Sequence, residues 1–307
     1  MDMLMVAHPE GDKTERFNSA GLDECLGMTW PVLDHGFVRA VDYMGNDSSI
    51  VRAARVSYGD GTTTLREDKG LIDYLLSHSH WTPFEMCEIK FHVRLPIFVA
   101  RQWVRHRTAS INEVSARYSV LKDEFYLPDE KDIASQSKFD KQSRDPDAPL
   151  ASDVAEAVQA MIETSCRLSF DTYKTMTSEA DEDDLQPGEF KVARELARLP
   201  LPVATYTSWY WKVNLRNLLH FLHLRMDEHA QAEIRAYAYT MAVITAKWVP
   251  WAYESWLRHV NDAETFSADE MDGLKFLIDE SSVEITAENL GLSKRQFAEF
   301  QKKLGLS

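Results

Sequence analysis

The sequence predicts an α+β protein in which a mixed or antiparallel sheet is flanked by long helices. Residues 88–95 alternate strictly between apolar and polar side chains, and residues 203–213 alternate in a similar way, which is typical of strands. Long segments with helical spacing of apolar residues surround these two strands, at 152–178, 215–226 and 228–248.

The first half of the chain is punctuated by recognisable start signals. Residues 1–36 are mixed in polarity and contain several glycines, so we expect them to be irregular. Asn46 and Asp47 can cap a helix, and Thr64 with Glu67 forms a capping-box pattern. The expected elements are a strand at 37–44, helices at 48–57 and 64–78, a strand at 88–95, and a helix at 96–107 that opens with Pro96.

The second half begins with a polar insertion and ends in an acidic tail. The polar, proline-bearing run at 131–149 reads as a surface loop or flexible insertion. The expected elements after it are a helix at 152–178 capped by Ser152, an acidic turn at 179–184, a helix at 189–198, a strand at 203–213, and helices at 215–226 and 228–248. We therefore expect one main domain over 1–263 and an acidic extension over 264–307, which has two short helical patterns and could form a small subdomain.

Charge and composition limit the classes of function. The formal net charge is -15 and the pI is near 5.1, which argues against general nucleic-acid binding. The three cysteines are far apart in sequence and fit a reducing compartment without a disulfide framework. No signal-peptide pattern and no apolar run of membrane-spanning length is present, so we expect a cytoplasmic protein with no membrane partner.

One stretch runs against the acidic balance of the chain. The segment RQWVRHRTASINEVSARY, residues 101–118, has four arginines and a histidine against a single carboxylate, Glu113. Guanidinium groups suit phosphate and carboxylate oxygens in bidentate geometry, and the following Ser and Asn side chains suit a base or ribose. On a helix, the consecutive Arg105, His106 and Arg107 point in three directions, so a site between elements or between subunits is needed to use all three.

Two other functional classes are open on the residues alone. A metal-dependent nucleotide hydrolase could use a second cluster of ionisable side chains, but this cluster lacks the H-E-x-x-H pattern. Its members are His220, His223, Asp227, Glu228 and His229. A nucleic-acid module could use RQWVRHR, although the single basic cluster and the acidic balance disfavour it.

Several segments together resemble the flavin-dependent thymidylate synthase family. RHRTASINEVSARY matches the family signature of R-H-R, a seven-residue gap and a serine, here Arg105, His106, Arg107 and Ser115. The segments RAARVSY, HSHWTPFEMCEIKFHVRLPIFVARQWVRHR and ARLPLPVATYTSWYWKVNLRNLLHFLHLRMDEHAQAEIR resemble further family blocks. The resemblance spans roughly residues 35–260.

The resemblance implies an activity and an assembly. Members of the family convert dUMP to dTMP with methylenetetrahydrofolate as carbon donor, FAD as hydride carrier and NADPH as reductant. They work as homotetramers whose active sites are built from several subunits. No cysteine of this chain stands in a nucleophile context, so activation of the uracil ring must be electrostatic.

The resemblance also implies roles for individual residues. Arg225 is expected to be the catalytic cation beside the pyrimidine. The residues expected to bind dUMP are Gln102, Arg105, Glu113, Ser115, Arg117, Arg198 and Arg225. The residues expected to bind FAD are Ser57, Thr82, Arg105, His106, Arg107, Glu113, Asn214, Arg216 and His220, the last standing where many family members have Asn. No family counterpart is assigned to the insertion at 131–149 or to the tail.

Overall fold

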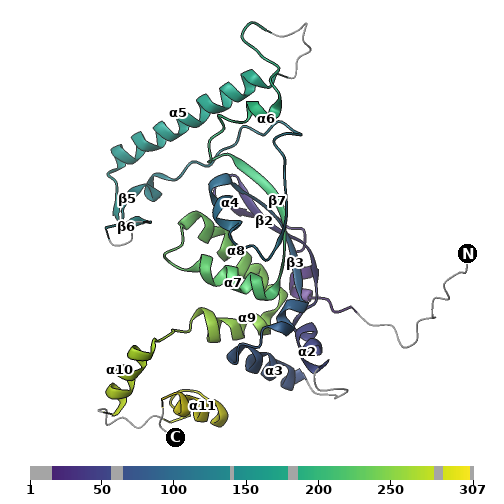
Figure 1. Ribbon diagram of the computed structural model, residues 1–307, viewed down its shortest axis with the longest axis vertical. Helices are drawn as coiled ribbons and strands as arrows, with labels where there is room; N and C mark the ends of the chain where they lie inside the picture. Colours follow the sequence, from purple (N-terminus) through teal and green to yellow (C-terminus); the bar gives the residue numbers. More distant parts are fainter. Residues whose placement is uncertain (1–15, 57–64, 139–141, 179–185, 280–285, 305–307) are drawn as a thin grey trace, which may run out of the picture. The chain divides into compact units, whose positions relative to one another are not determined.

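The chain folds into two compact units, Met1–Asn261 and Asp262–Ser307. The computed structural model shown in Figure 1 describes residues 16–56, 65–138, 142–178, 186–279 and 286–304 of the 307-residue chain. The expected helix cap at Thr64 and the expected acidic turn at 179–184 lie outside these residues.

A five-stranded sheet forms the centre of the first unit. Its order is β1 (Trp30–Val32), β2 (Gly36–Met44), β3 (Glu88–Pro96), β7 (Tyr206–Asn214) and β4 (Ser110–Glu113). Each neighbouring pair is antiparallel. The predicted α+β class is therefore confirmed, and this sheet is antiparallel rather than mixed.

The alternation predicted for residues 88–95 places the core on one face of the sheet. Phe91 and Val93 of β3 are fully buried, and Phe91 stacks on Trp211 of β7 with ring centroids 6.4 Å apart. The helices α7 (Leu215–Met226) and α8 (Ala232–Trp248) pack together over this face (Figure 1). Trp103 of α4 (Ile97–Trp103) is buried in the same core, 4.6 Å from the ring of Phe221 in α7.

Three helices and a short 3-10 turn gather at one end of the sheet. They are α2 (Asp47–Arg55), α3 (Leu65–Ser77), η2 (Thr82–Met86) and α9 (Pro250–Trp256). Asn46 caps α2 with a reciprocal capping box to Ser49, as its position in the sequence predicted. Asp47 is buried and accepts hydrogen bonds from the backbone N–H groups of Trp251 and Ala252, each at 3.0 Å. The start of α2 thereby satisfies the free N–H groups at the start of α9.

The long helix α5 (Ser152–Met176) belongs to a second, smaller core. Its residues Cys166, Phe170 and Tyr173 are buried with Phe125 and with Ala197 of α6 (Arg194–Ala197) (Figure 1). Ala151 precedes α5 as its N-cap without a side-chain bond, so the expected cap by Ser152 is wrong; Ser152 is the first residue of the helix.

The polar insertion contains more structure than its composition suggested. Residues 134–136 (β5, Ala134–Gln136) and 144–149 (β6, Arg144–Pro149) pair as a small antiparallel sheet. Arg144 joins this sheet to the core, since its guanidinium lies 2.8 Å from the carboxylate of buried Glu233 in α8. The expectation of a simple loop is wrong because this buried partner, far away in sequence, holds the insertion.

Other boundaries also differ from the expectations. Residues 1–36 are not wholly irregular, since α1 (Ala20–Asp23) and β1 lie within them. The helix expected at 96–107 ends at Trp103, the one expected at 189–198 is limited to α6, and the one expected from 228 begins at Ala232. The sequence reading also missed α9 and the π-helical turn Leu257–Asn261 that follows it.

The second unit contains the two helices that its apolar patterns predicted. They are α10 (Ala268–Asp279) and α11 (Lys294–Leu304). A capping box starts α10, because the N–H of Ser267 donates to the Glu270 carboxylate at 2.8 Å and the N–H of Glu270 donates back to the Ser267 hydroxyl at 3.3 Å. Among the helices that the structure describes in either unit, none has the length and apolar character needed to cross a membrane.

Candidate functional site

The arginine-rich motif leaves its helix before the R-H-R triplet. Trp103 is fully buried and ends α4, and the next N–H groups turn back in a tight final turn, with the N–H of His106 donating to the carbonyl of Trp103 at 3.0 Å. Arg105 and Arg107 are consequently exposed, whereas His106 between them is half-buried. The prediction that Arg105, His106 and Arg107 lie on the helix is therefore wrong, but their side chains still differ in their surroundings.

His106 meets the predicted catalytic residue Arg225 of α7. The Nε of Arg225 donates a hydrogen bond of 3.0 Å to Nε2 of His106, and the His106 ring stands edge-on to Phe221 at 5.0 Å. Burial, reinforced by the positive charge of Arg225 and by electrostatic interaction with His220, lowers the pKa of His106 to about 4. The imidazole is thus neutral near pH 7 and accepts this bond.

Arg225 is a half-buried cation that has no carboxylate partner in the part of the chain that the structure describes. Burial lowers the pKa of Arg225 from its ordinary value, yet a guanidinium stays protonated at neutral pH. Within the described residues it forms no ion pair, and it donates a hydrogen bond to the neutral His106. A positive charge that is held by a neutral ring and partly withdrawn from water is suited to stabilise a negative charge that develops beside it.

Other predicted arginines differ in whether a carboxylate neutralises them. Arg117 pairs with Glu195 at 3.4 Å, and Arg216 pairs with Glu85 at 2.5 Å. In the part of the chain that the structure describes, three further predicted ligands are exposed and form no ion pair. These are Arg105, Arg107 and Arg198. Unpaired guanidinium groups in so acidic a chain indicate sites for anionic ligands.

Part of the segment after the R-H-R triplet forms the strand β4, Ser110–Glu113. β4 pairs with the edge of β7, with Glu113 opposite Trp209. The Glu113 carboxylate accepts a 2.6 Å hydrogen bond from the Thr207 hydroxyl. Ser115 follows the strand, and its hydroxyl accepts from the N–H of Arg117 at 3.3 Å. Pairing with β7 therefore fixes the backbone that carries the predicted dUMP ligands.

Two amide side chains complete the local framework. Asn214 is the N-cap of α7 and accepts a 2.9 Å hydrogen bond from the N–H of Asn217. Gln102 of α4 donates through Nε2 to the Oε1 of Gln231, the N-cap of α8. Each predicted ligand is thus attached to the start of one of the two helices that cover the sheet.

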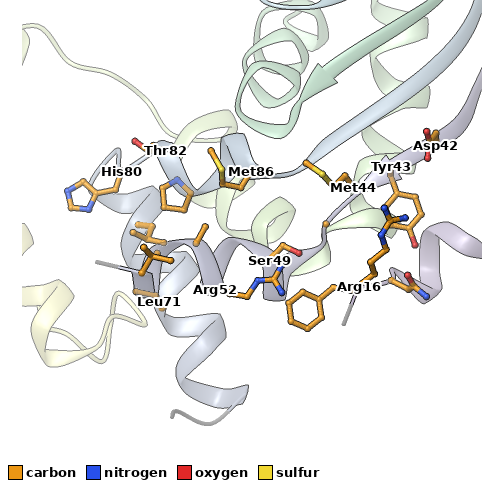
Figure 2. A pocket seen from close by; sticks show the side chains of 18 of the residues that line it. Arg16, Asp42, Tyr43, Met44, Ser49, Arg52, Leu71, His80, Thr82 and Met86 are labelled. Carbon is orange, nitrogen blue, oxygen red and sulfur yellow. The ribbon is translucent and has the colours of Figure 1, made fainter. Parts of the chain in front are cut away.

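A cavity of about 1480 Å³ lies between the end of β2, α2, α3 and η2. Figure 2 shows His80 and Thr82 at one end and Arg16, Tyr43 and Asp42 at the other, with Met44, Met86, Ser49 and Arg52 between them. The Arg52 guanidinium lies over the Phe17 ring, 4.6 Å from its centroid, and forms no ion pair among the described residues. The lining combines apolar side chains with the cations Arg16 and Arg52 and, towards one end, the carboxylate of Asp42, which suits an elongated ligand with rings and phosphates.

The structure brings together some of the predicted site residues and not others. His106, Arg225 and His220 are neighbours, and the rings of the two histidines are 6.1 Å apart. Thr82 lines the cavity, but the other described residues predicted to bind FAD or dUMP are not among those that line it. Ser57 lies outside the described residues.

Sequence reasoning missed several residues that surround the predicted ligands. Gln231 holds Gln102, Glu85 neutralises Arg216, and Arg52 lines the cavity. Glu85 lies within the T-P-F-E block that carries part of the resemblance, so it could have been singled out. Arg52 begins the RAARVSY segment and Gln231 lies near the end of the last quoted segment, so both also fall within the resemblance, but only the tertiary packing shows what they contact.

The cysteines are poor candidates for a nucleophile. Cys25, Cys87 and Cys166 are free and buried. Burial, with a contribution from the charge of Asp47, raises the pKa of Cys87 to about 12, and burial also raises the pKa of Cys166. A thiol of this kind forms almost no thiolate at neutral pH.

The histidine-rich stretch around α7 does not assemble a metal site within the described residues. His229 is bound to Asp227 at 2.9 Å, whereas His220 is directed towards His106. No group of three or more His, Cys, Asp or Glu side chains in the described ranges could hold a metal ion.

Comparisons with known proteins place this geometry in context. Residues 39–251 match the family model described as "Thymidylate synthase complementing protein". Proteins named flavin-dependent thymidylate synthase are similar along most of their length. That of Rickettsia conorii is 50% identical over 95% of this chain and 99% of its own, and that of Ruegeria pomeroyi is 49% identical over 95% and 93%. The larger part of residues 264–307 therefore falls within the match, because this segment is much longer than the uncovered 5%.

Solved structures of a relative show the same fold. The UMP/dUMP methylase PolB from Streptomyces cacaoi, bound with 5-Br UMP, is 32% identical and has a TM-score of 0.63. The match covers 75% of this chain and 97% of that one. A second structure of that methylase, bound with 5-Br dUMP, has a TM-score of 0.64 over the same coverage.

Proposed function

The chain belongs to the flavin-dependent thymidylate synthase family, and we infer from this membership that it is an enzyme that reductively methylates dUMP to dTMP. The structural observation that supports it most directly is the guanidinium of Arg225, which forms no ion pair within the described residues and is held by the neutral imidazole of His106 at 3.0 Å. The methylase of Streptomyces cacaoi, which was solved with bromo analogues of UMP and dUMP, supports a uridine monophosphate as the substrate.

Arg225 activates the uracil ring in this proposal. Attack of carbon 5 on a one-carbon donor requires electron density in the ring, which increases when the ring is deprotonated. A fixed guanidinium beside the ring stabilises the resulting enolate-like anion and lowers its energy in the transition state. Because His106 is neutral, it holds Arg225 in place without neutralising its charge. Buried, protonated thiols such as that of Cys87 take no covalent part.

The phosphate of dUMP is expected at exposed cations close to Ser115. Arg198 follows α6, and the ion pair of Arg117 with Glu195 brings the segment after β4 to the same helix. Gln102, Arg105 and Glu113 complete the proposed dUMP set, as the family resemblance implies.

The residues present fit FAD as the hydride carrier. Arg105 and Arg107 are exposed and have no carboxylate partner among the described residues, which leaves them available for a diphosphate. Thr82 lies on the elongated cavity beside η2, where unpaired Arg52 adds positive charge. Bound FAD supplies the hydride that turns a methylene into a methyl group, with NADPH as its reductant and methylenetetrahydrofolate as the carbon donor. The remaining proposed FAD ligands are Ser57, His106, Glu113, Asn214, Arg216 and His220.

We propose that the active sites form between the subunits of a homotetramer. The proposed dUMP ligands Ser115 and Arg198 are bordered by exposed apolar side chains, including Tyr118 at 78% and Leu199 at 76% exposure. Apolar side chains around unpaired cations favour a surface that another subunit covers. This assembly also explains why one chain does not gather all proposed ligands in a single cavity. The free, buried cysteines agree with the proposed cytoplasmic location.

The proposal is tested first by colour and then by turnover. The purified protein is expected to show flavin absorbance in the blue, to change its spectrum when dUMP is added, and to form dTMP with methylenetetrahydrofolate and NADPH. Arg225→Ala is expected to retain FAD and lose dTMP formation. Arg235→Ala is the matched control, since Arg235 is a half-buried arginine of the neighbouring helix α8. A protein that stays colourless after incubation with FAD, or full turnover by Arg225→Ala, contradicts the proposal.

A further inference from the structure

The helix α5 has a second apolar face that the second core does not use. Its inner face carries Cys166, Phe170 and Tyr173, which are buried against α6 and the segment around Phe125. On the outer face, large apolar side chains remain exposed at 45%, 69% and 68%. These are Val154, Met161 and Leu168.

The spacing of these residues is that of a helix-pairing seam. Val154, Met161 and Leu168 repeat every seven residues, which is two helical turns, so they form one row along the helix. Ala157 lies in the same row and is small enough to allow close approach. A row one side chain wide is characteristic of the contact between two helices and too narrow for the edge of a globular core.

The charged side chains beside the row are of opposite sign at the two ends, so they face each other only if a second α5 packs in the antiparallel direction. Asp153 near the start of α5 and Arg167 near its end flank the row on the same side, each directly before an apolar member. Asp153 has no ion-pair partner among the described residues. Arg167 pairs with Glu163 of the same helix at 2.7 Å, and its guanidinium lies over the Phe125 ring, 5.7 Å from the centroid. Such an exposed pair contributes little, so it can be exchanged for a pair across an interface.

We propose that the outer face of α5 is a two-fold interface at which the same helix of a second copy packs antiparallel. Met161, the middle residue of the row, lies beside the axis, and Val154 faces Leu168 of the partner subunit. The axis then generates two equivalent ion pairs, from Asp153 to Arg167 of the partner subunit and the reverse. The occupant is a second copy of this chain because one surface supplies both halves of the charge pattern. The interface goes beyond the proposed function and does not depend on flavin chemistry.

Crosslinking at single introduced cysteines tests the geometry in the full-length protein. Met161→Cys is expected to give a covalent dimer with a short bis-maleimide at low protein concentration. Thr175→Cys is not, because in an antiparallel pair its two copies are about 42 Å apart. Met28→Cys, at a methionine that is 58% exposed outside α5, is the matched control, as is the wild type with its three buried cysteines. The proposal is overturned if Met161→Cys gives no covalent dimer. It is also overturned if Met161→Cys crosslinks no more than Thr175→Cys or Met28→Cys.

Charge reversal tests the register independently of crosslinking. Arg167→Asp places like charges opposite each other twice and is expected to raise the dissociation constant of the affected contact at least about tenfold, measured by light scattering over a dilution series. Adding Asp153→Arg to the same chain is expected to restore the wild-type constant. Retained far-UV circular dichroism establishes that both variants are folded. If the double variant is as weak as Arg167→Asp, or if neither differs from the wild type, the pairing is wrong.

Discussion

The contact between His106 and Arg225 makes a quantitative prediction about stability and pH. Burial, with the charge of Arg225 and electrostatic interaction with His220, lowers the pKa of His106 from 6.5 to about 4 in the folded protein. The unfolded chain therefore binds a proton more readily, and stability is lost as the pH falls from about 6.5 towards 4. The full shift corresponds to about 3.4 kcal/mol, and since the ring is only half-buried we expect about 1–2 kcal/mol.

The assay is urea unfolding between about pH 7 and pH 4, with His106→Gln as the comparison. The glutamine amide oxygen can still accept from Arg225 but does not titrate, so the difference in unfolding free energy between the two proteins isolates the titration of His106. Wild type is expected to lose about 1–2 kcal/mol more than the variant over this range. Parallel curves, or a wild type that gains stability relative to the variant at acid pH, refute the neutral imidazole as the partner of Arg225.

Three further predictions concern other contacts of the first unit. Burial raises the pKa of Asp47 to about 6, so ionisation of its carboxyl group opposes folding. As the pH is raised from 4 to 6, the unfolding free energy of wild type relative to Asp47→Asn should decrease by about 1–3 kcal/mol in urea titrations. An increase over this range contradicts the prediction. Arg144→Met removes the cation from the buried Glu233 carboxylate, which keeps only the hydrogen bond from the Tyr126 hydroxyl among the described residues, and should cost about 1–3 kcal/mol by thermal unfolding; Arg144→Met with unchanged stability shows that the insertion is not anchored there. Arg52→Met should weaken FAD binding about tenfold by fluorescence titration if the cavity receives a phosphate of the cofactor, and unchanged affinity places FAD elsewhere.

Local patterns predicted the elements whose signals lie within a few residues. Alternation over 88–95 identified β3, and the cap at Asn46 identified the start of α2. By contrast, α4 stops at Trp103 because the chain must turn there to bring His106 to α7. The strand β4 forms because its fully exposed residues pair with β7, about a hundred residues later in the chain. No local pattern encodes such partners, so the boundaries that depend on them were missed.

The candidate site shows the same division. The R-H-R triplet and Arg225 were identified from residue type and family resemblance, and the structure adds that His106 is the group that holds Arg225. Gln231 lies within a segment that carries the resemblance, but its contact with Gln102 arises only from tertiary packing. The seven-residue spacing of the exposed apolar residues of α5 is visible in the sequence. Only the burial of the opposite face in the second core shows that these residues are not used within the subunit.

The most direct test of the account is a single-turnover measurement of dTMP on the reduced, FAD-loaded enzyme with dUMP and methylenetetrahydrofolate. Two proteins are compared with wild type: Arg225→Ala, and a variant in which Cys25, Cys87 and Cys166 are all replaced by alanine. The cysteine-free protein is expected to form dTMP at the wild-type rate, whereas Arg225→Ala is expected to be slower by about 100- to 1000-fold with FAD still bound. A folded, FAD-loaded cysteine-free protein that makes no dTMP, beside an active Arg225→Ala, contradicts activation by fixed guanidinium charge.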